Sequence, residues 1–142
     1  MKKSYAFVAV QFMAIIILIL TGSIFPADIA LLTIMILFLL FGLWAMFVHR
    51  FRFNALPDLR DDSSLKTSGP YRLVRHPMYT SLIFITLIWV VNDFSIFRLA
   101  TWIILLVTIH LKSEYEEQLL IKKFPEYTQY KVSTKKIIPF IY

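Results

Sequence analysis

The chain has 142 residues, of which 58% are hydrophobic and 17% are charged, and its formal net charge is +6. A soluble domain is about half apolar and about a quarter charged, whereas the apolar residues here lie in long uninterrupted runs that are typical of membrane spans. The chain has no cysteine, which excludes disulfides, thiolate catalysis and cysteine-ligated zinc or iron–sulfur sites. Three histidines far apart in the sequence do not favour a histidine metal site either.

Two apolar runs open the chain. They cover Tyr5–Leu20 and Ile29–Val48, with 16 and 20 residues, and as helices they would reach roughly 24–30 Å, enough to cross a bilayer core. The connection between them is so short that it allows only a tight reversal. We therefore predict an antiparallel two-helix hairpin over residues 1–49. Because no clear cleavage pattern follows the first run, we expect that helix to be retained.

A polar segment follows, from Arg50 to Arg75, and its backbone cannot lie in lipid without protein or water to satisfy it. The third apolar run, Met78–Val91, comes directly after Pro77. Proline is favoured at the first position of a helix, so we expect the third helix to begin there.

The fourth apolar run, Phe94–Leu111, forms a helical hairpin with the third. Its helix should continue to Lys123 as an amphipathic arm outside the membrane, and a last short helix is expected over residues 127–132. The sequence thus predicts an all-α, polytopic integral membrane protein with about four transmembrane helices. We treat residues 1–142 as a single membrane-embedded domain, with residues 50–142 as its core of helical hairpin and C-terminal arm.

The basic residues of the chain indicate its orientation in the membrane. Fourteen of the fifteen lysines and arginines lie before the first run, between the second and third, or after the fourth. The positive-inside rule then places both termini and the polar segment in the cytoplasm of a multi-pass cell-membrane protein. Arg98 is the one basic residue on the other side, and we expect it to be an interfacial anchor.

The segment Arg75-His76-Pro77-Met78-Tyr79 is the richest in residues suited to chemistry. The position before a proline disfavours helical geometry, so His76 should lie extended just before a helix begins. The free N–H groups of a helix start can hold a carboxylate or phosphate, and Arg75 and His76 could add donors. The rings of Tyr71 and Tyr79 would suit a cation. A membrane-interface turn with a snorkelling arginine is equally compatible with these residues alone.

A second polar group lies about forty residues later. Glu116 is one helical turn after Lys112, so the two share a helix face, as in an ordinary solvated ion pair. However, Leu119 and Leu120 predict that this helix docks on an apolar surface, where a carboxylate needs a positive partner or a ligand. The three glycines of the chain are too scattered to form a glycine-rich nucleotide-binding loop.

Two motifs occur together at a distinctive spacing. The first is Leu65-x-Thr67-Ser68-Gly69-Pro70-Tyr71-x-x-x-Arg75-His76-Pro77-x-Tyr79, and the second is Glu116-Glu117-x-x-Leu120 followed by Phe124-Pro125-Glu126-Tyr127-x-x-Tyr130 and Ile138-Pro139. Together they resemble the signatures of the isoprenylcysteine carboxyl methyltransferase family. The wider group includes phospholipid N-methyltransferases and small bacterial members. The resemblance covers residues 65–142, more than half of the chain.

The resemblance implies an integral-membrane methyltransferase that uses S-adenosylmethionine. Its cofactor pocket would be cytoplasmic, formed by the central loop and the C-terminal helices. Carried over residue by residue, the cofactor-binding residues would be Leu65, Lys66, Tyr71, Arg75, His76, Tyr79 and Glu116, with Leu65 and Lys66 in contact through their backbone.

Two positions depart from the family pattern. Some members have arginine where this chain has Lys112, and many have glycine where it has Ser81. A lysine keeps the positive charge but loses the bidentate geometry of arginine. We therefore expect Lys112 to orient the methyl acceptor, although a prenylcysteine carboxylate is less assured as that acceptor.

The expected partners are the bilayer and a lipophilic acceptor that enters from it and carries a carboxylate, thiol or amine. No nucleic acid and no metal ion are expected, and a protein this small could form a homodimer to complete a lipid-side groove. Two other classes remain open. One is an NADPH-dependent membrane reductase of the sterol reductase type, which would need a larger basic site. The other is a non-catalytic lipid-binding protein whose basic loop meets anionic headgroups.

Overall fold

The computed structural model describes residues 2–48 and 65–139, and within these ranges the backbone is helical with no β-strand, which confirms the all-α class. The elements in chain order are α1 (Lys2–Leu20), α2 (Ile29–Val48), the 3-10 helix η1 (Gly69–Arg72), α3 (Pro77–Asn92), α4 (Ile96–Lys123) and α5 (Tyr127–Ser133). Most of the predicted polar segment, residues 49–64, lies outside the described residues.

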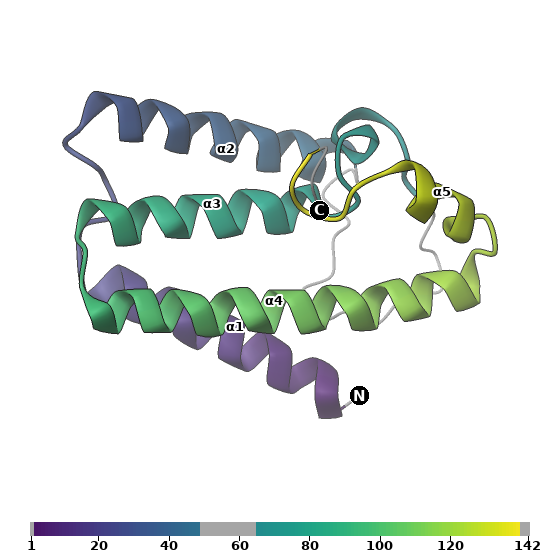
Figure 1. The fold of residues 1–142 in the computed structure, drawn as a ribbon, viewed down its shortest axis with the longest axis horizontal. Helices are drawn as coiled ribbons and strands as arrows, with labels where there is room; N and C mark the ends of the chain where they lie inside the picture. Colours follow the sequence, from purple (N-terminus) through teal and green to yellow (C-terminus); the bar gives the residue numbers. More distant parts are fainter. Residues whose placement is uncertain (1, 49–64, 140–142) are drawn as a thin grey trace.

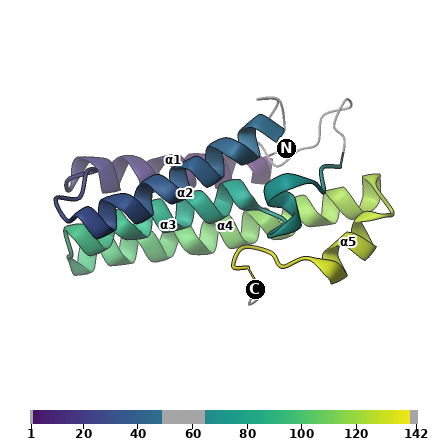
Figure 2. The same ribbon diagram turned by 90° about the horizontal axis from the view of Figure 1, so that it is seen from above.

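The four long helices lie side by side in the order α2, α3, α4, α1, with alternating directions (Figure 1). The main contacts join α2 to α3 and α1 to α4, and α3 packs against α4 to hold the two pairs together. The first two helices, expected as an N-terminal hairpin, therefore make their main contacts with different partners. Both η1 and α5 lie at the end of the bundle where the chain begins (Figures 1 and 2).

Local signals set the helix boundaries. The Asp28 carboxylate accepts a hydrogen bond of 2.9 Å from the backbone N–H of Leu31 and caps α2. The Ser95 hydroxyl caps α4 in the same way by accepting from the N–H of Arg98 at 3.2 Å. Because Ser95 is the cap, α4 begins at Ile96 and not at Phe94. As predicted, α3 begins at Pro77.

The buried core lies mainly between α1, α3 and α4. Its members are Ala14, Leu18, Ile83, Val90, Leu105, Ile109 and Ile137. By contrast, α2 buries only Met35 and Ala45 and leaves most of its apolar side chains on the surface. Two helices, α2 and α4, are long and apolar enough to cross a membrane, while the apolar stretches of α1 and α3 are shorter.

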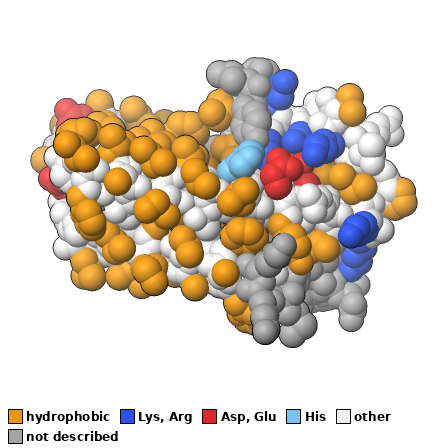
Figure 3. Space-filling view, turned by 60° about the horizontal axis from the view of Figure 1, so that its bottom comes forward, with side chains coloured by type: hydrophobic (Ala, Val, Ile, Leu, Met, Phe, Trp, Pro, Cys, Tyr) orange, Lys and Arg blue, Asp and Glu red, His pale blue; other side chains and the backbone are white. Residues whose placement is uncertain are grey.

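Polar and apolar surfaces are separated along the bundle. In Figure 3 hydrophobic side chains cover most of the bundle, and the lysine, arginine and histidine side chains gather towards one end, whereas acidic side chains are seen at both ends. The polar part of α4 begins at Lys112, directly after Leu111, so its last turns extend beyond the apolar surface.

Arg98 differs from the interfacial anchor expected from the sequence, because it is only 2% exposed. Its Nη1 atom donates to the carbonyl oxygen of Leu18 and to the hydroxyl of Thr21, both at 2.9 Å, and Nη2 donates to the carbonyl oxygen of Trp89 at 2.7 Å. The last turns of α1 and α3 leave carbonyl groups that need donors. Arg98 supplies them and ties three helices together at the end of the bundle away from η1 and α5.

Candidate functional site

The site is built around the turn before α3. His76 is the N-cap of that helix, and its backbone has φ −125° and ψ 62°, outside the helical region as the following proline predicts. The backbone N–H groups of Arg75 and His76 donate to the carbonyl oxygens of Lys135 and Lys136, at 2.8 and 3.0 Å. Val74 and Lys135 form a parallel β-bridge beside them. The segment after α5 therefore runs alongside the turn and fixes its backbone.

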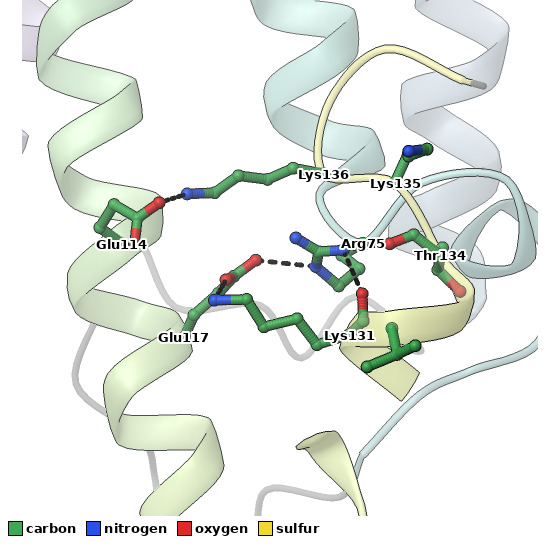
Figure 4. Close-up of a pocket in the computed structure, with 8 residues that line it drawn as sticks. Arg75, Glu114, Glu117, Lys131, Thr134, Lys135 and Lys136 are labelled. Carbon is green, nitrogen blue, oxygen red and sulfur yellow. Dashed lines mark hydrogen bonds and ion pairs between the residues drawn. The ribbon is translucent and has the colours of Figure 1, made fainter. Parts of the chain in front are cut away.

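The turn before α3, helix α4 and the end of α5 meet at one place, which we call the joint, and the Glu117 carboxylate lies at its centre (Figure 4). Its side chain is 1% exposed. One carboxylate oxygen lies 2.8 Å from Arg75 Nε and 3.2 Å from His76 Nε2, and the other lies 2.8 Å from Lys131 Nζ. Burial alone would raise the pKa of Glu117, but the hydrogen bonds from His76, Lys131 and Arg75 outweigh it and hold that pKa well below its usual range. Glu117 therefore stays ionised, with its charge compensated by protein groups.

The Arg75 guanidinium is also engaged on its other side. Its Nη1 atom donates to the carbonyl oxygen of Lys131 at 3.0 Å and to the carbonyl oxygen of Thr134. Together with the ion pair to Glu117, these bonds connect the turn, α4 and the end of α5. Arg75 therefore links all three segments of the joint.

Glu116 lies beside Glu117 in sequence but in different surroundings. Its nearest basic side-chain atom is Nδ1 of His76, at 3.6 Å, and it accepts a hydrogen bond from the hydroxyl of Tyr79. Burial raises the pKa of Glu116, and nearby His76 and Lys112 offset only part of that effect. Its negative charge is therefore less well compensated than that of Glu117.

Aromatic rings frame the Glu116 side of the site. The rings of His76 and Tyr79 stack with their centroids 5.4 Å apart and an angle of 13° between their planes. Tyr71 is buried in η1, and its carbonyl oxygen accepts a hydrogen bond from the hydroxyl of Tyr130. Burial, with Tyr130 and Glu116 nearby, raises the pKa of Tyr71 above its usual value, so the phenol stays neutral.

Lys112 lies on α4 one helical turn before Glu116 and forms the rest of the Glu116 side of the site. The side chain is buried, and its ammonium donates to Oε1 of Gln11 on α1 at 2.9 Å. The same ammonium lies over the ring of Tyr79, 5.2 Å from the centroid. Lys112 thus connects α1 with the wall formed by Tyr79 and Glu116.

A cavity of about 290 Å³ adjoins the joint. It is lined by Arg75, Glu114, Glu117, Lys131, Val132, Thr134, Lys135 and Lys136. Figure 4 shows that these residues come from the turn before α3, from α4, from α5 and from the segment after α5. At about 100° per residue, Glu114 and Glu117 point to a different face of α4 from Lys112 and Glu116. Of the residues predicted to bind the cofactor, only Arg75 lines this cavity.

The structure thus brings together six of the residues singled out from the sequence: Tyr71, Arg75, His76, Tyr79, Lys112 and Glu116. Leu65 and Lys66 are half-buried ahead of η1, and within the described ranges neither forms a hydrogen bond or ion pair with this cluster.

Sequence reasoning missed the roles of Glu117 and Gln11. The buried positions of α4 recur every four residues through Leu105, Ile109, Ser113 and Glu117, and that period could have shown which glutamate faces inward. Gln11 is the one strongly polar residue inside the first apolar run, which was the available signal for a buried partner.

Comparison with known proteins adds the family. Residues 27–127 match the model of the phospholipid methyltransferase family, from just before α2 to the start of α5. The chain belongs to that family. No curated protein and no solved structure matches it. The match confirms the group of membrane methyltransferases that the two motifs resemble, and with the apolar helices of the bundle it makes this phospholipid methyltransferase family member a membrane protein.

Proposed function

We propose that the protein is a multi-pass membrane methyltransferase that uses S-adenosylmethionine and methylates a lipophilic acceptor. In this proposal all four long helices span the bilayer, and η1, α5 and both ends of the described chain face the cytoplasm. The observation that carries the proposal is the meeting of the Arg75-His76-Pro77-x-Tyr79 turn with Glu116 and Glu117 at one end of an apolar bundle.

The difference between the two glutamates supports Glu116 as the residue that meets the cofactor. S-adenosylmethionine carries a sulfonium and an ammonium, and it supplies an electrophilic methyl group. A cationic ligand gains most from a carboxylate whose charge is not already neutralised by the protein. Glu117 pairs with two cations, Arg75 and Lys131, and also contacts His76, whereas Glu116 has only His76 at 3.6 Å and the more distant Lys112.

The other cofactor contacts follow from the same wall. The Tyr71 ring and the face of His76 turned away from Tyr79 suit a sulfonium, while Tyr79 supports this wall by stacking on His76. No side chain caps the N-terminus of α3, so its first N–H groups are available to the carboxylate of an amino acid. Arg75 supports this wall by holding the turn, and Leu65 and Lys66 would contact the cofactor through their backbone. We assign no step to the cavity at Lys131 and Lys136.

Methyl transfer is an in-line displacement that depends on positioning more than on acid–base help. The acceptor would enter from the bilayer, where Lys112 follows the last apolar residue of α4, and its ammonium would orient a carboxylate or another negatively charged group. Glu116 and the rings would hold the cofactor on the polar side. The acceptor atom that receives the methyl group is an oxygen, sulfur or nitrogen, and we favour a carboxyl oxygen.

Calorimetry on the purified protein in detergent tests the proposal. We expect S-adenosylmethionine to bind the wild type and to lose at least tenfold in affinity in Glu116→Ala, while Glu126→Ala, an exposed carboxylate on the same side, binds like the wild type. Tritiated-methyl transfer to prenylcysteine analogues, phosphatidylethanolamine vesicles and small thiols then identifies the acceptor class. Binding of NADPH in place of S-adenosylmethionine would favour a reductase, and binding of neither would leave a lipid-binding protein.

A further inference from the structure

One side of α1 carries a buried stripe that faces α4. Ser4, Gln11 and Leu18 are spaced seven residues apart, and all three are buried. In a packed helix pair, positions with this spacing stay in the interface. The matched family region, residues 27–127, starts after α1, so Gln11 lies outside the matched residues, whereas its partner Lys112 lies within them.

The Lys112 ammonium requires such a contact. Its residue is 2% exposed, and a charged amine removed from water is costly unless hydrogen bonds and opposite charge compensate it. An ammonium has three N–H donors. Gln11 Oε1 accepts one at 2.9 Å, and the ring of Tyr79 takes another side of the charge. The third N–H donor of the ammonium is left for Glu116 or for a ligand.

The position of this ammonium matters because a lysine side chain is long and flexible. Without the Gln11 amide, Lys112 would lose the acceptor that draws it towards α1, and several rotamers would become available to it. Leu111, the residue before it, is exposed at the end of the apolar part of α4, which is where the headgroup of a membrane-embedded molecule would arrive.

We propose that Gln11 is a positioning residue of the acceptor side: its amide oxygen fixes the Lys112 ammonium between α1 and Tyr79, where the ammonium binds the anionic oxygen of a lipid acceptor. The anionic group is a carboxylate or a phosphate. This inference rests on the proposed methyltransferase function. It assigns α1 a role in substrate recognition that the matched family region does not contain.

The kinetic test compares Gln11→Leu, Gln11→Glu and Lys112→Met, with Met13→Leu as a control at an exposed position of the same helix. A hydrogen bond to a buried charge corresponds to about tenfold or more in affinity. We expect Gln11→Leu to raise the KM for a prenylcysteine carboxylate or for phosphatidylethanolamine about tenfold, with little change in kcat or in the Kd for S-adenosylmethionine. Gln11→Glu should restore the KM, because it returns an acceptor to the ammonium.

The double variant decides whether Gln11 acts through Lys112. In the Lys112→Met background, Gln11→Leu should have no further effect on KM. An equal effect in both backgrounds, or a KM that does not change in Gln11→Leu, would overturn the proposal. The KM for an uncharged long-chain thiol should not change in Gln11→Leu. A KM change for the prenylcysteine carboxylate indicates that Lys112 binds a carboxylate, and a KM change for phosphatidylethanolamine indicates that it binds a phosphate.

A second measurement does not depend on finding the acceptor. Acetylation of lysines by an N-hydroxysuccinimide ester, read by mass spectrometry, should modify Lys112 about tenfold faster in Gln11→Leu than in the wild type, relative to exposed Lys122. Equal rates would show that Gln11 does not hold the ammonium. If the wild type fails to bind S-adenosylmethionine, the proposed function is lost, and the labelling still decides whether Gln11 positions Lys112.

Discussion

At the scale of single residues, two adjacent glutamates differ in how far their charges are compensated, because their neighbours differ. Glu117 is held by Arg75, His76 and Lys131, whereas Glu116 has the weaker compensation expected of a carboxylate that meets a cationic ligand. His76 lies between the two, with one ring nitrogen towards each. A neutral imidazole has only one N–H to donate, so it cannot donate to both carboxylates at once.

Removal of the Glu117 charge should destabilise the protein. Glu117→Gln leaves the Arg75 guanidinium and the Lys131 ammonium without their counter-ion, and breaking a buried ion pair costs about 3–5 kcal/mol. Denaturant unfolding in mixed micelles should show a loss of this size. Glu126→Gln, which neutralises an exposed carboxylate, should change the free energy of unfolding by less than about 0.5 kcal/mol. Equal stabilities of the two variants would contradict the role of Glu117.

Binding of S-adenosylmethionine should weaken in acid because of Glu116. The ligand is cationic and favours the ionised carboxylate, and burial raises the pKa of Glu116 in the free protein. Affinity should therefore be full above that pKa and fall as pH decreases through it, approaching tenfold per pH unit, and the fall should begin at a higher pH than for an ordinary glutamate. Calorimetry between pH 8 and pH 4 measures this.

Glu116→Gln is the matched control for the pH profile. It keeps His76 and Lys112 in place, so its weaker binding should be nearly independent of pH. A profile in Glu116→Gln that still falls like the wild type would show that Glu116 is not the group responsible.

At the scale of elements, the sequence predicts the long helices well and the short ones unevenly. Apolar runs bounded by polar residues locate α2 over Ile29–Val48, and the prolines at 77 and 125 predict where α3 begins and α4 ends. The helix η1 was not predicted, because four residues carry no period and depend on contacts from elsewhere. Its first residue, Gly69, has φ +61° and lies against Trp44 and Val48 of α2.

A side chain at position 69 should disturb η1. In Gly69→Ala the left-handed backbone costs about 1 kcal/mol, and the new Cβ would lie 3.2 Å from Cγ2 of Val48. We expect a loss of about 1–2 kcal/mol in unfolding free energy and weaker cofactor binding, because Tyr71 is two residues away. Ser68→Ala, at an exposed position with φ −104°, is the control. Unchanged stability and binding in Gly69→Ala would show that η1 tolerates movement.

At the scale of the whole molecule, the bundle has two different ends. Arg98 joins α1, α3 and α4 at one end, and the site lies about 27 Å along α4 from it, at about 1.5 Å per residue between positions 98 and 116. The sequence shows that the basic residues share one side, but not that Arg98 is buried. A lone charge near the end of an apolar run has the same pattern whether it meets water or the carbonyl groups of neighbouring helices.

Cysteine labelling tests the orientation, and the cysteine-free chain makes the experiment direct. Ala27→Cys introduces a thiol at the exposed α1–α2 connection, and Thr128→Cys introduces one on α5 at the opposite end. With the proposed orientation, in which the basic end faces the cytoplasm, a membrane-impermeant maleimide should label Ala27→Cys in intact cells and Thr128→Cys only after the membrane is permeabilised. The reverse labelling pattern would show the opposite orientation. Labelling of both thiols in intact cells would show that the two ends of the bundle do not lie on opposite sides of the membrane.

The bonds between the turn and the segment after α5 also order events during synthesis. Arg75 and His76 receive their backbone partners from Lys135 and Lys136, which the ribosome adds about 60 residues later. At roughly 5–20 residues per second, this gap lasts about 3–12 s. During that time the turn lacks the backbone carbonyl groups of Lys135 and Lys136, and Arg75 lacks the carbonyl acceptors of Lys131 and Thr134. The turn therefore completes its backbone hydrogen bonds only seconds after it has been synthesised, once the segment after α5 is available.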